Sequence, residues 1–383
     1  MNIYIDIGTT TVAASNDENE KLSVPNPQKA FGLDVVSRLA YAKENGTEEL
    51  RSSIVGCINS IINELSHGRT ENVSGVYVSA NTAMCCLFTG ADPSPLAAFP
   101  YNVPDHFGRT FTSGSLGLIS KNAGVFVSRC LSAFFGGDVL SGMISADLDR
   151  KKENYLYIDI GTNGEIAAGT SERTLYASTA AGPALEGGNV SCGASGITGA
   201  VSSIGSVECV DGTVKLKEYD TIGKTEDIAG LCGSALIDLL SLLKKGGFID
   251  ELGVLGADVV LPCGFTLTQS DVSALQLAKS AVRAGIECLL DAVKIDENNL
   301  DAVYIAGIMG AKIDMEHACE IGLFPGYIKY KAHLLGNMAL EGARSMEKEE
   351  NRERAESFAS KAKKLSLSGN KRFEMLFEEN ILL

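Results

Sequence analysis

The six-residue sequence YIDIGT occurs twice, at Tyr4–Thr9 and at Tyr157–Thr162. Each copy is typical of a buried strand that delivers an aspartate and then turns through glycine and threonine. Backbone N–H groups and hydroxyls at such a turn suit phosphate oxygens, and Asp6 or Asp159 could hold a metal-bound water. One short D-x-G-T segment is often an ordinary strand with a glycine turn. Two identical copies, each followed by a polar residue and another strand, favour two phosphate-binding turns.

Other phosphate-binding motifs are less favoured by this sequence. Neither G-x-G-x-x-G nor G-x-x-x-x-G-K-[ST] follows a predicted strand, which argues against a Rossmann or P-loop site.

The acidic composition argues against some classes of binding partner. The formal net charge is −15, and no basic stripe is available for phosphate backbones, so we expect no nucleic acid and no membrane as partner. No run of apolar residues approaches the roughly 18 of a membrane span. The N-terminus enters a strand without a basic leader region, and we therefore expect a cytoplasmic protein.

The ten cysteines are scattered along the chain. No C-x-x-C occurs, and the spacing does not match zinc or iron–sulfur ligands, so we expect no iron–sulfur cluster on this chain. The neighbours Cys85 and Cys86 are expected to pack in the core, because free cysteine is commonly buried.

The elements that position the repeated turns can be read from apolar spacing. We expect a hairpin over 2–15, helices over 29–45 and 48–68, and a short strand at 73–81. We further expect a helix over 128–147 broken at Gly136–Gly137, a hairpin over 206–218, a helix ending at Gly246–Gly247, and a long helix with Thr268 as its N-cap. A strand over 301–307 runs into a glycine turn, and a charged helix follows Met346.

The arrangement resembles the acetate and sugar kinase, heat-shock chaperone and actin superfamily of ATPases. The resemblance implies an α/β, two-lobed actin-like ATPase fold with duplicated ribonuclease-H-like lobes and a nucleotide cleft between them. Lobe I would span 1–150 and lobe II 151–335. Residues 336–383 would form the second connecting helix and a tail that packs back on lobe I. The cofactors implied are ATP and Mg²⁺.

The superfamily motifs map onto this sequence residue by residue. Two acids, Asp6 and Asp159, would hold Mg²⁺ through water, and Asp138 in "FFGGDVLSG" is either a catalytic acid that orients the attacking water or an ordinary helix cap. The nucleotide-binding residues implied are Gly8, Thr9, Thr10 and Thr11 of the first phosphate motif, Gly161, Thr162, Asn163 and Gly164 of the second, Gly233 and Ser234 at a helix entry, and Gly307 and Gly310 of the adenosine motif.

Roles for several residues stay open. Glu165 and Glu186 could hold water or metal, or cap a turn, and Asn81 could face the nucleotide or bond the turn backbone. For Gly233 and Ser234, a tight helix entry is an equal alternative to anion binding. Gly336 and Gly342 in "LLGNMALEGA" would permit close packing of the second connecting helix.

Finer matches resemble the ATPase domain of the reductive activators of corrinoid proteins. They include "AGPALEGGNVSCG", "GLCGSALID", "IGLFPG" and "LSLSGNKRFEMLF", and they run in order over nearly the whole chain. The resemblance implies a homodimer that couples ATP to the return of a Co(II) corrinoid methyl-carrier protein to Co(I). In that family the electron enters through an iron–sulfur domain on the same chain. This sequence begins at the first phosphate strand, so we expect a separate ferredoxin-like electron donor.

One motif departs from the family pattern. The adenosine loop reads Gly-Ile-Met-Gly at 307–310, where Gly-Gly-Phe-Gly is expected, which puts adenine stacking and nucleotide preference in question. Two alternative functions remain. A small-molecule kinase of the same superfamily would use Asp138 as base, and a non-catalytic interaction protein would bind nucleotide without turnover.

Overall fold

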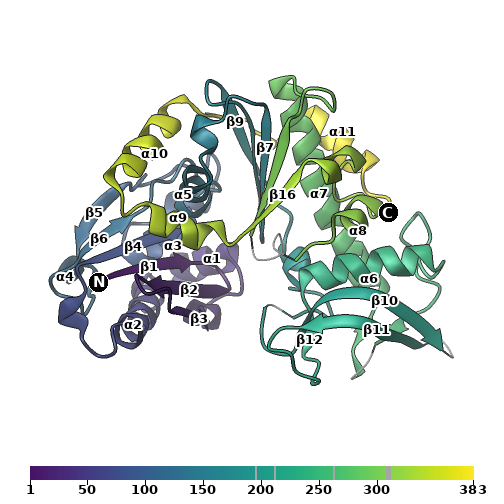
Figure 1. Cartoon of the computed structure of the whole chain (residues 1–383), viewed down its shortest axis with the longest axis horizontal. Coiled ribbons are helices and arrows are strands. Elements are labelled where there is room, and N and C mark those ends of the chain that lie inside the picture. The colour runs from purple at the N-terminus through teal and green to yellow at the C-terminus, as the bar shows by residue number, and fades with distance from the viewer. Residues whose placement is uncertain (195, 211–212, 262–263, 308–311) are drawn as a thin grey trace. The chain divides into compact units, whose positions relative to one another are not determined.

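The computed structural model describes residues 1–194, 196–210, 213–261, 264–307 and 312–383 (Figure 1). The chain divides into two compact units. Unit 1 comprises Met1–Arg150 and Asn337–Ala362, and unit 2 comprises Lys151–Gly336 and Lys363–Leu383.

Unit 1 is built on a six-stranded mixed sheet with the order β3-β2-β1-β4-β6-β5. Its strands are β1 (Asn2–Ile7), β2 (Thr11–Asn16), β3 (Lys21–Pro25), β4 (Gly75–Ala80), β5 (Arg109–Thr112) and β6 (Gly124–Val127). The hairpin expected over 2–15 is confirmed, because β1 and β2 pair antiparallel. The strands β1, β4 and β6 run parallel, so their carboxyl ends meet at one edge of the sheet.

The helices of unit 1 include the amphipathic helices expected near 29–45 and 48–68, and α3 and α4, which were not predicted. They are α1 (Val35–Asn45), α2 (Glu48–Leu65), α3 (Thr82–Thr89), α4 (Ser113–Leu116), α5 (Gly137–Ser145), α9 (Met338–Ser345) and α10 (Glu349–Lys361). Helix α1 begins at a capping box in which Asp34 and Ser37 bond each other's backbone. Cys85 and Cys86 are fully buried in this unit's core, as expected.

One expected helix begins later than predicted. The segment from Ser128 to Gly136 is not helical, and α5 starts at Gly137 instead of being broken there. A Cβ on Gly137 would lie 2.8 Å from the carbonyl oxygen of Ser128, so glycine is needed where the chain passes close to the preceding strand end. The two glycines therefore permit the entry into the helix.

Unit 2 repeats the strand arrangement of unit 1. Its six-stranded sheet has the order β16-β15-β7-β8-β9-β17. The strands are β7 (Tyr155–Ile160), β8 (Gly164–Gly169), β9 (Thr174–Thr179), β15 (Ala302–Ala306), β16 (Ala332–Gly336) and β17 (Lys363–Lys364). As in unit 1, three antiparallel strands are followed by two parallel ones, with β7, β15 and β16 in the places of β1, β4 and β6. The duplicated α/β organisation expected from the sequence is confirmed.

Unit 2 adds a second sheet, of order β12-β10-β11-β13-β14. Its strands are β10 (Ala200–Val210), β11 (Thr213–Thr221), β12 (Gly230–Leu231), β13 (Val259–Val260) and β14 (Thr266–Leu267). The expected hairpin over 206–218 is present as β10 and β11, while its tip, residues 211–212, lies outside the described residues.

Four α-helices of unit 2 lie in the described ranges: α6 (Gly233–Lys245), α7 (Gln269–Val293), α8 (Met315–Glu320) and α11 (Lys371–Glu379). Thr268 caps α7 as predicted, in a capping box with Asp271. Among the described residues, no helix is both long and apolar enough to cross a membrane.

The C-terminal tail differs from the sequence-based expectation. Residues 363–383 belong to unit 2, whereas residues 337–362 belong to unit 1. Strand β17 pairs with β9, and the buried Nζ of Lys279 on α7 donates to the carbonyl oxygen of Asn380, at 2.7 Å. A buried cation that meets the carbonyls at the end of α11 holds this segment on α7. Burial lowers the pKa of Lys279 to about 8.

Close packing of α9 on α5 gives a stability prediction. A Cβ on Gly342 would lie 2.6 Å from the backbone nitrogen of Gly142, so we expect Gly342→Ala to destabilise unit 1 by about 1–3 kcal/mol. Gly56, inside α2, has no atom within 4 Å of its Cβ position, and Gly56→Ala should stabilise by about 0.5–1 kcal/mol. Urea denaturation of both variants checks this, and a gain in stability from Gly342→Ala would contradict it.

Candidate functional site

The first repeated turn, between β1 and β2, has its carbonyl oxygens bonded to the interior of unit 1. The carbonyl of Gly8 accepts from the Asn26 side chain at 2.8 Å, and that of Thr10 accepts from the Asn26 backbone at 2.9 Å. The carbonyl of Thr9 accepts from the guanidinium of Arg38 at 2.6 Å. Asn26 and Arg38 are fully buried. None of these contacts uses the N–H groups of the turn, which are the groups that suit an anion.

Gly8 itself is required by space. A Cβ at this position would lie 2.7 Å from the carbonyl oxygen of Thr11, closer than real contacts allow. The glycine of the repeated sequence therefore permits a turn that closes on itself.

Asp6 lies at the carboxyl edge of the sheet with two amide side chains nearby. Asn337, the N-cap of α9, donates to the Oδ2 of Asp6 at 3.1 Å. Asn81 follows β4, caps α3 through Met84, and donates from Nδ2 to the Thr9 hydroxyl oxygen at 3.2 Å. Asn81 thus bonds the side chain of the turn and the backbone of its own helix.

Asp138 reaches the same edge from α5. A Cβ on Gly136, two residues before Asp138, would lie 2.5 Å from the Cα of Asn81, so the start of α5 lies close against the end of β4. The partly buried Asp138 accepts at Oδ1 from the backbone N–H of Val139, at 2.8 Å. Burial raises the pKa of Asp138 to about 6. A carboxyl near this value can accept a proton at neutral pH.

The second repeated turn, between β7 and β8, already has a carboxylate bonded to it. The Thr162 hydroxyl donates to Oε2 of Glu186 at 2.5 Å. The backbone N–H of Gly161 donates to the carbonyl of Asn163 at 3.0 Å, which closes the turn. Burial raises the pKa of Glu186, and hydrogen bonds from Thr162 oppose that rise.

Asp159 is flanked by a tyrosine and by the start of the adenosine motif. The Tyr157 hydroxyl is 3.4 Å from Oδ2 of Asp159. Gly307 follows β15 with φ +90°, and its Cβ position lies 3.0 Å from Oδ1 of Asp159. Only glycine allows this approach without strain. The other adenosine residue, Gly310, lies outside the described residues.

The two turns differ in length although their sequences begin identically. Ile7 pairs with Val12, whereas Ile160 pairs with Gly164, so the second turn is one residue shorter. As a result Ala13 stands opposite Asp6, while Glu165 stands opposite Asp159. Cross-strand neighbours share a face, so unit 2 places two carboxylates side by side.

The helix entry at Gly233 and Ser234 is buried. The Ser234 hydroxyl donates to the carbonyl of Ser202 at 2.6 Å, and the residue is 2% exposed. This contact supports a structural role for the Ser234 hydroxyl at the start of α6. Phosphate binding by Gly233 and Ser234 stays a prediction.

Several supporting residues were missed by sequence reasoning. The first turn is bonded by Asn26 and Arg38, and Asp6 is bonded by Asn337. From the sequence, no role is predicted for any of these three residues. The Asn-Pro pair at residues 26–27 was a usable turn signal. There was no usable signal in the sequence for Arg38, a fully buried arginine inside an amphipathic helix.

The acids beside the two turns could supply only part of a metal site. Within the described ranges, no group of three or more His, Cys, Asp or Glu residues could hold a metal. Mg²⁺ is commonly bound through one or two carboxylates together with waters and phosphate oxygens. Asp6, or Asp159 beside Glu165, offers such a partial set.

A duplicated α/β unit with an Asp-x-Gly-Thr turn after its first strand defines the ASKHA class of ATPase domains, a nucleotide-binding fold. The family model described as the C-terminal domain of RACo, the ASKHA domain, matches residues 153–383, and the model for the RACo middle region matches residues 1–151. The chain belongs to the RACo family.

Relatives of known name agree with this membership. The chain is 33% identical to corrinoid activation enzyme RamQ of Eubacterium limosum, over 89% of this chain and 63% of that protein. It is 30% identical to the [Co(II) methylated amine-specific corrinoid protein] reductase of Methanosarcina barkeri, over 91% of this chain and 70% of that protein.

A solved structure, the reductive activator for corrinoid, iron-sulfur protein, matches with 30% identity and a TM-score of 0.89. The match covers all of this chain and 66% of that one. The chain thus spans about two thirds of the length of the relatives it matches.

The raised pKa of Asp138 predicts a pH-dependent stability difference. Because the folded pKa, about 6, exceeds the ordinary 3.8, the contribution of this carboxyl to stability is present below pH 3.8 and is lost as pH rises through 6. We expect Asp138→Asn to be more stabilising, relative to wild type, at pH 8 than at pH 4, as measured by urea denaturation.

Asp105→Asn is the matched control, because the hydrogen bond from Arg109 lowers the pKa of Asp105. The stabilising contribution of Asp105 is present above its unfolded pKa and is lost as pH falls through the folded value. Asp105→Asn should therefore be more destabilising, relative to wild type, at pH 8 than at low pH. A pH-independent difference for Asp138→Asn would contradict the assignment.

Proposed function

We propose that this chain is an ATP-driven activator of corrinoid proteins. It binds Mg-ATP, hydrolyses it to ADP and phosphate, and helps return the Co(II) form of a corrinoid methyl-carrier protein to Co(I). The reduction takes up one electron per cobalt, which a separate ferredoxin-like protein supplies. The protein acts in the cytoplasm as a homodimer.

Family membership over both units carries this proposal. The two matched family regions together cover nearly every residue, and both curated relatives are named for activation or reduction of corrinoid proteins.

The two repeated turns are proposed to bind the phosphates. In the first, Gly8, Thr9, Thr10 and Thr11 present the N–H groups and hydroxyls of a turn whose carbonyls are bonded elsewhere. In the second, the corresponding residues are Gly161, Thr162, Asn163 and Gly164. Gly233 and Ser234 add the start of α6, and Gly307 and Gly310 let the nucleoside approach the backbone.

Asp6 and Asp159 are proposed to hold waters of the magnesium ion, which neutralises charge on the phosphates when it is bound. Asp138 is proposed to orient the attacking water and accept its proton, and its pKa of about 6 suits that task. The water oxygen bonds to the γ-phosphorus while the bond to the ADP oxygen breaks. The proton ends in solvent.

ATP can promote the reduction only through differential affinity. A nucleotide shifts a conformational equilibrium by the difference between its binding free energies for the two states. The proposal therefore requires that nucleotide-bound protein binds the corrinoid partner more tightly in its easily reduced state.

We expect Mg-ATP hydrolysis by the purified protein to rise when a Co(II) corrinoid methyl-carrier protein is added. Asp6→Ala should lower this turnover by about a hundredfold, because a charge that helps place the metal is lost. Asp258→Ala, at an exposed aspartate, is the matched control and should leave turnover unchanged. Phosphate release measures both.

Other outcomes identify other functions. Turnover stimulated by a small hydroxylated substrate and not by the corrinoid protein would indicate a kinase. Tight ATP binding without turnover or partner effect would indicate a nucleotide-binding interaction protein. Either result would overturn the activator proposal.

A further inference from the structure

An anion belonging to the chain itself sits at the second repeated turn. Oε2 of Glu186 accepts from the Thr162 hydroxyl at 2.5 Å. The second oxygen, Oε1, lies 3.5 Å from the Cβ position of Gly161. The carboxylate therefore lies beside the glycine and accepts from a hydroxyl that the turn would offer to a phosphate.

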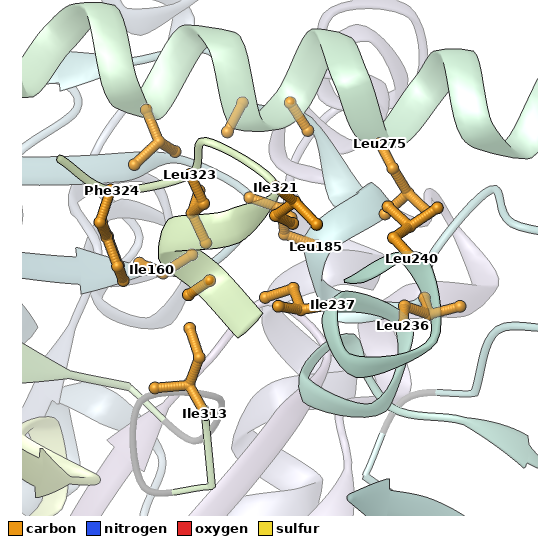
Figure 2. Close-up of a cluster of buried hydrophobic side chains, with 14 of the residues drawn as sticks. Ile160, Leu185, Leu236, Ile237, Leu240, Leu275, Ile313, Ile321, Leu323 and Phe324 are labelled. Carbon is orange, nitrogen blue, oxygen red and sulfur yellow. The ribbon is translucent and has the colours of Figure 1, made fainter. Parts of the chain in front are cut away.

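Both partners of this contact are anchored in one hydrophobic core. Ile160 precedes the turn and Leu185 precedes Glu186, and Figure 2 shows both in the same cluster of buried side chains. Ile160 is 2% exposed and Leu185 is 1% exposed. The short helix that contains Leu185 and Glu186 (Pro183–Glu186) ends at Gly187 with φ +81°. The core thus holds the carboxylate within reach of the turn.

Charge makes the contact specific. Burial raises the pKa of Glu186, and the hydrogen bonds from Thr162 oppose that effect by stabilising the ionised form. A buried carboxylate needs such donors, because an unpaired one is costly. In the first turn the corresponding threonine, Thr9, is bonded by the neutral amide of Asn81. The two turns are therefore equipped differently.

We propose that Glu186 is an internal stand-in for a phosphate group. Its carboxylate occupies the Thr162 hydroxyl of the second turn, and a phosphate must displace it to bind there. The inference rests on the proposed function, because it assumes that nucleotide phosphates reach this turn. Two anions cannot accept the same hydroxyl proton, so binding moves the Glu186 carboxylate away from the turn.

This displacement has two consequences. The apparent affinity for nucleotide is reduced by the fraction of molecules in which Glu186 occupies the turn. It also makes the position of the Glu186 side chain depend on whether nucleotide is bound, since the contact between Glu186 and Thr162 is broken. Glu186 is thus a residue that sets the cost of binding, distinct from the acids proposed to act in hydrolysis.

The test is the affinity for Mg-ATP, measured by titration calorimetry on the full chain. Glu186→Gln keeps the shape of the side chain and removes its charge, and it should tighten Mg-ATP binding about fivefold or more. Adenosine, which lacks phosphate, should bind equally to both proteins. Glu172→Gln changes the net charge equally at an exposed site and should leave Mg-ATP affinity unchanged.

Two further variants keep the test decisive. Glu186→Asp replaces Glu186→Gln in the test if the latter does not fold. It shortens the side chain by one methylene and withdraws the carboxylate from Thr162, so it should also tighten Mg-ATP binding. In a Thr162→Val background, the gain from Glu186→Gln should shrink, because the shared hydrogen bond is already absent.

Unchanged or weaker Mg-ATP binding in folded Glu186→Gln would overturn the inference while leaving the proposed function intact. Lost hydrolysis with unchanged affinity would also overturn it and would assign Glu186 a catalytic role. Failure of the wild-type chain to bind Mg-ATP at all would instead overturn the proposed function.

Discussion

The chemistry proposed for this chain depends on which groups form hydrogen bonds with the carbonyl oxygens of a tight turn between two strands. In unit 1 the carbonyls of Gly8, Thr9 and Thr10 are bonded to Asn26 and Arg38, both fully buried. Without those partners, carbonyl oxygens would compete for the space where an anion should bind, and their dipoles would repel it. The sheet, the helix that carries Arg38 and the segment around Asn26 together form the support for one turn.

The duplication that repeats the turn does not repeat its surroundings. The second turn is one residue shorter, and this places Glu165, in place of an alanine, across from the aspartate. Its threonine meets the carboxylate of Glu186, whereas Thr9 meets an amide. The first turn is thus bonded by amides and a guanidinium, whereas the second turn has two acidic side chains beside it. The two repeated turns therefore differ in the groups that surround them.

Much of this could be predicted from local sequence. The repeated YIDIGT signature predicts the duplicated units, because strand and turn preferences are encoded within a few residues, and Thr268 caps α7 for the same reason. Asp6 was singled out from the repeat itself and Asp138 from the superfamily resemblance, and their roles stay predictions. The tail, Arg38 and the Glu186–Thr162 contact were not predictable. They depend on tertiary packing between segments distant in sequence, and a one-residue difference in turn length changes every cross-strand partner.

The most direct test of the account is ATP-dependent formation of Co(I). An anaerobic mixture would contain a Co(II) corrinoid methyl-carrier protein, titanium(III) citrate as the low-potential electron donor, and this protein. The absorbance of Co(I) would then be followed after addition of Mg-ATP. The account predicts that Co(I) accumulates with Mg-ATP and this protein together, and that the Asp6→Ala variant does not support it. Equal accumulation of Co(I) without ATP, or without this protein, would contradict the account.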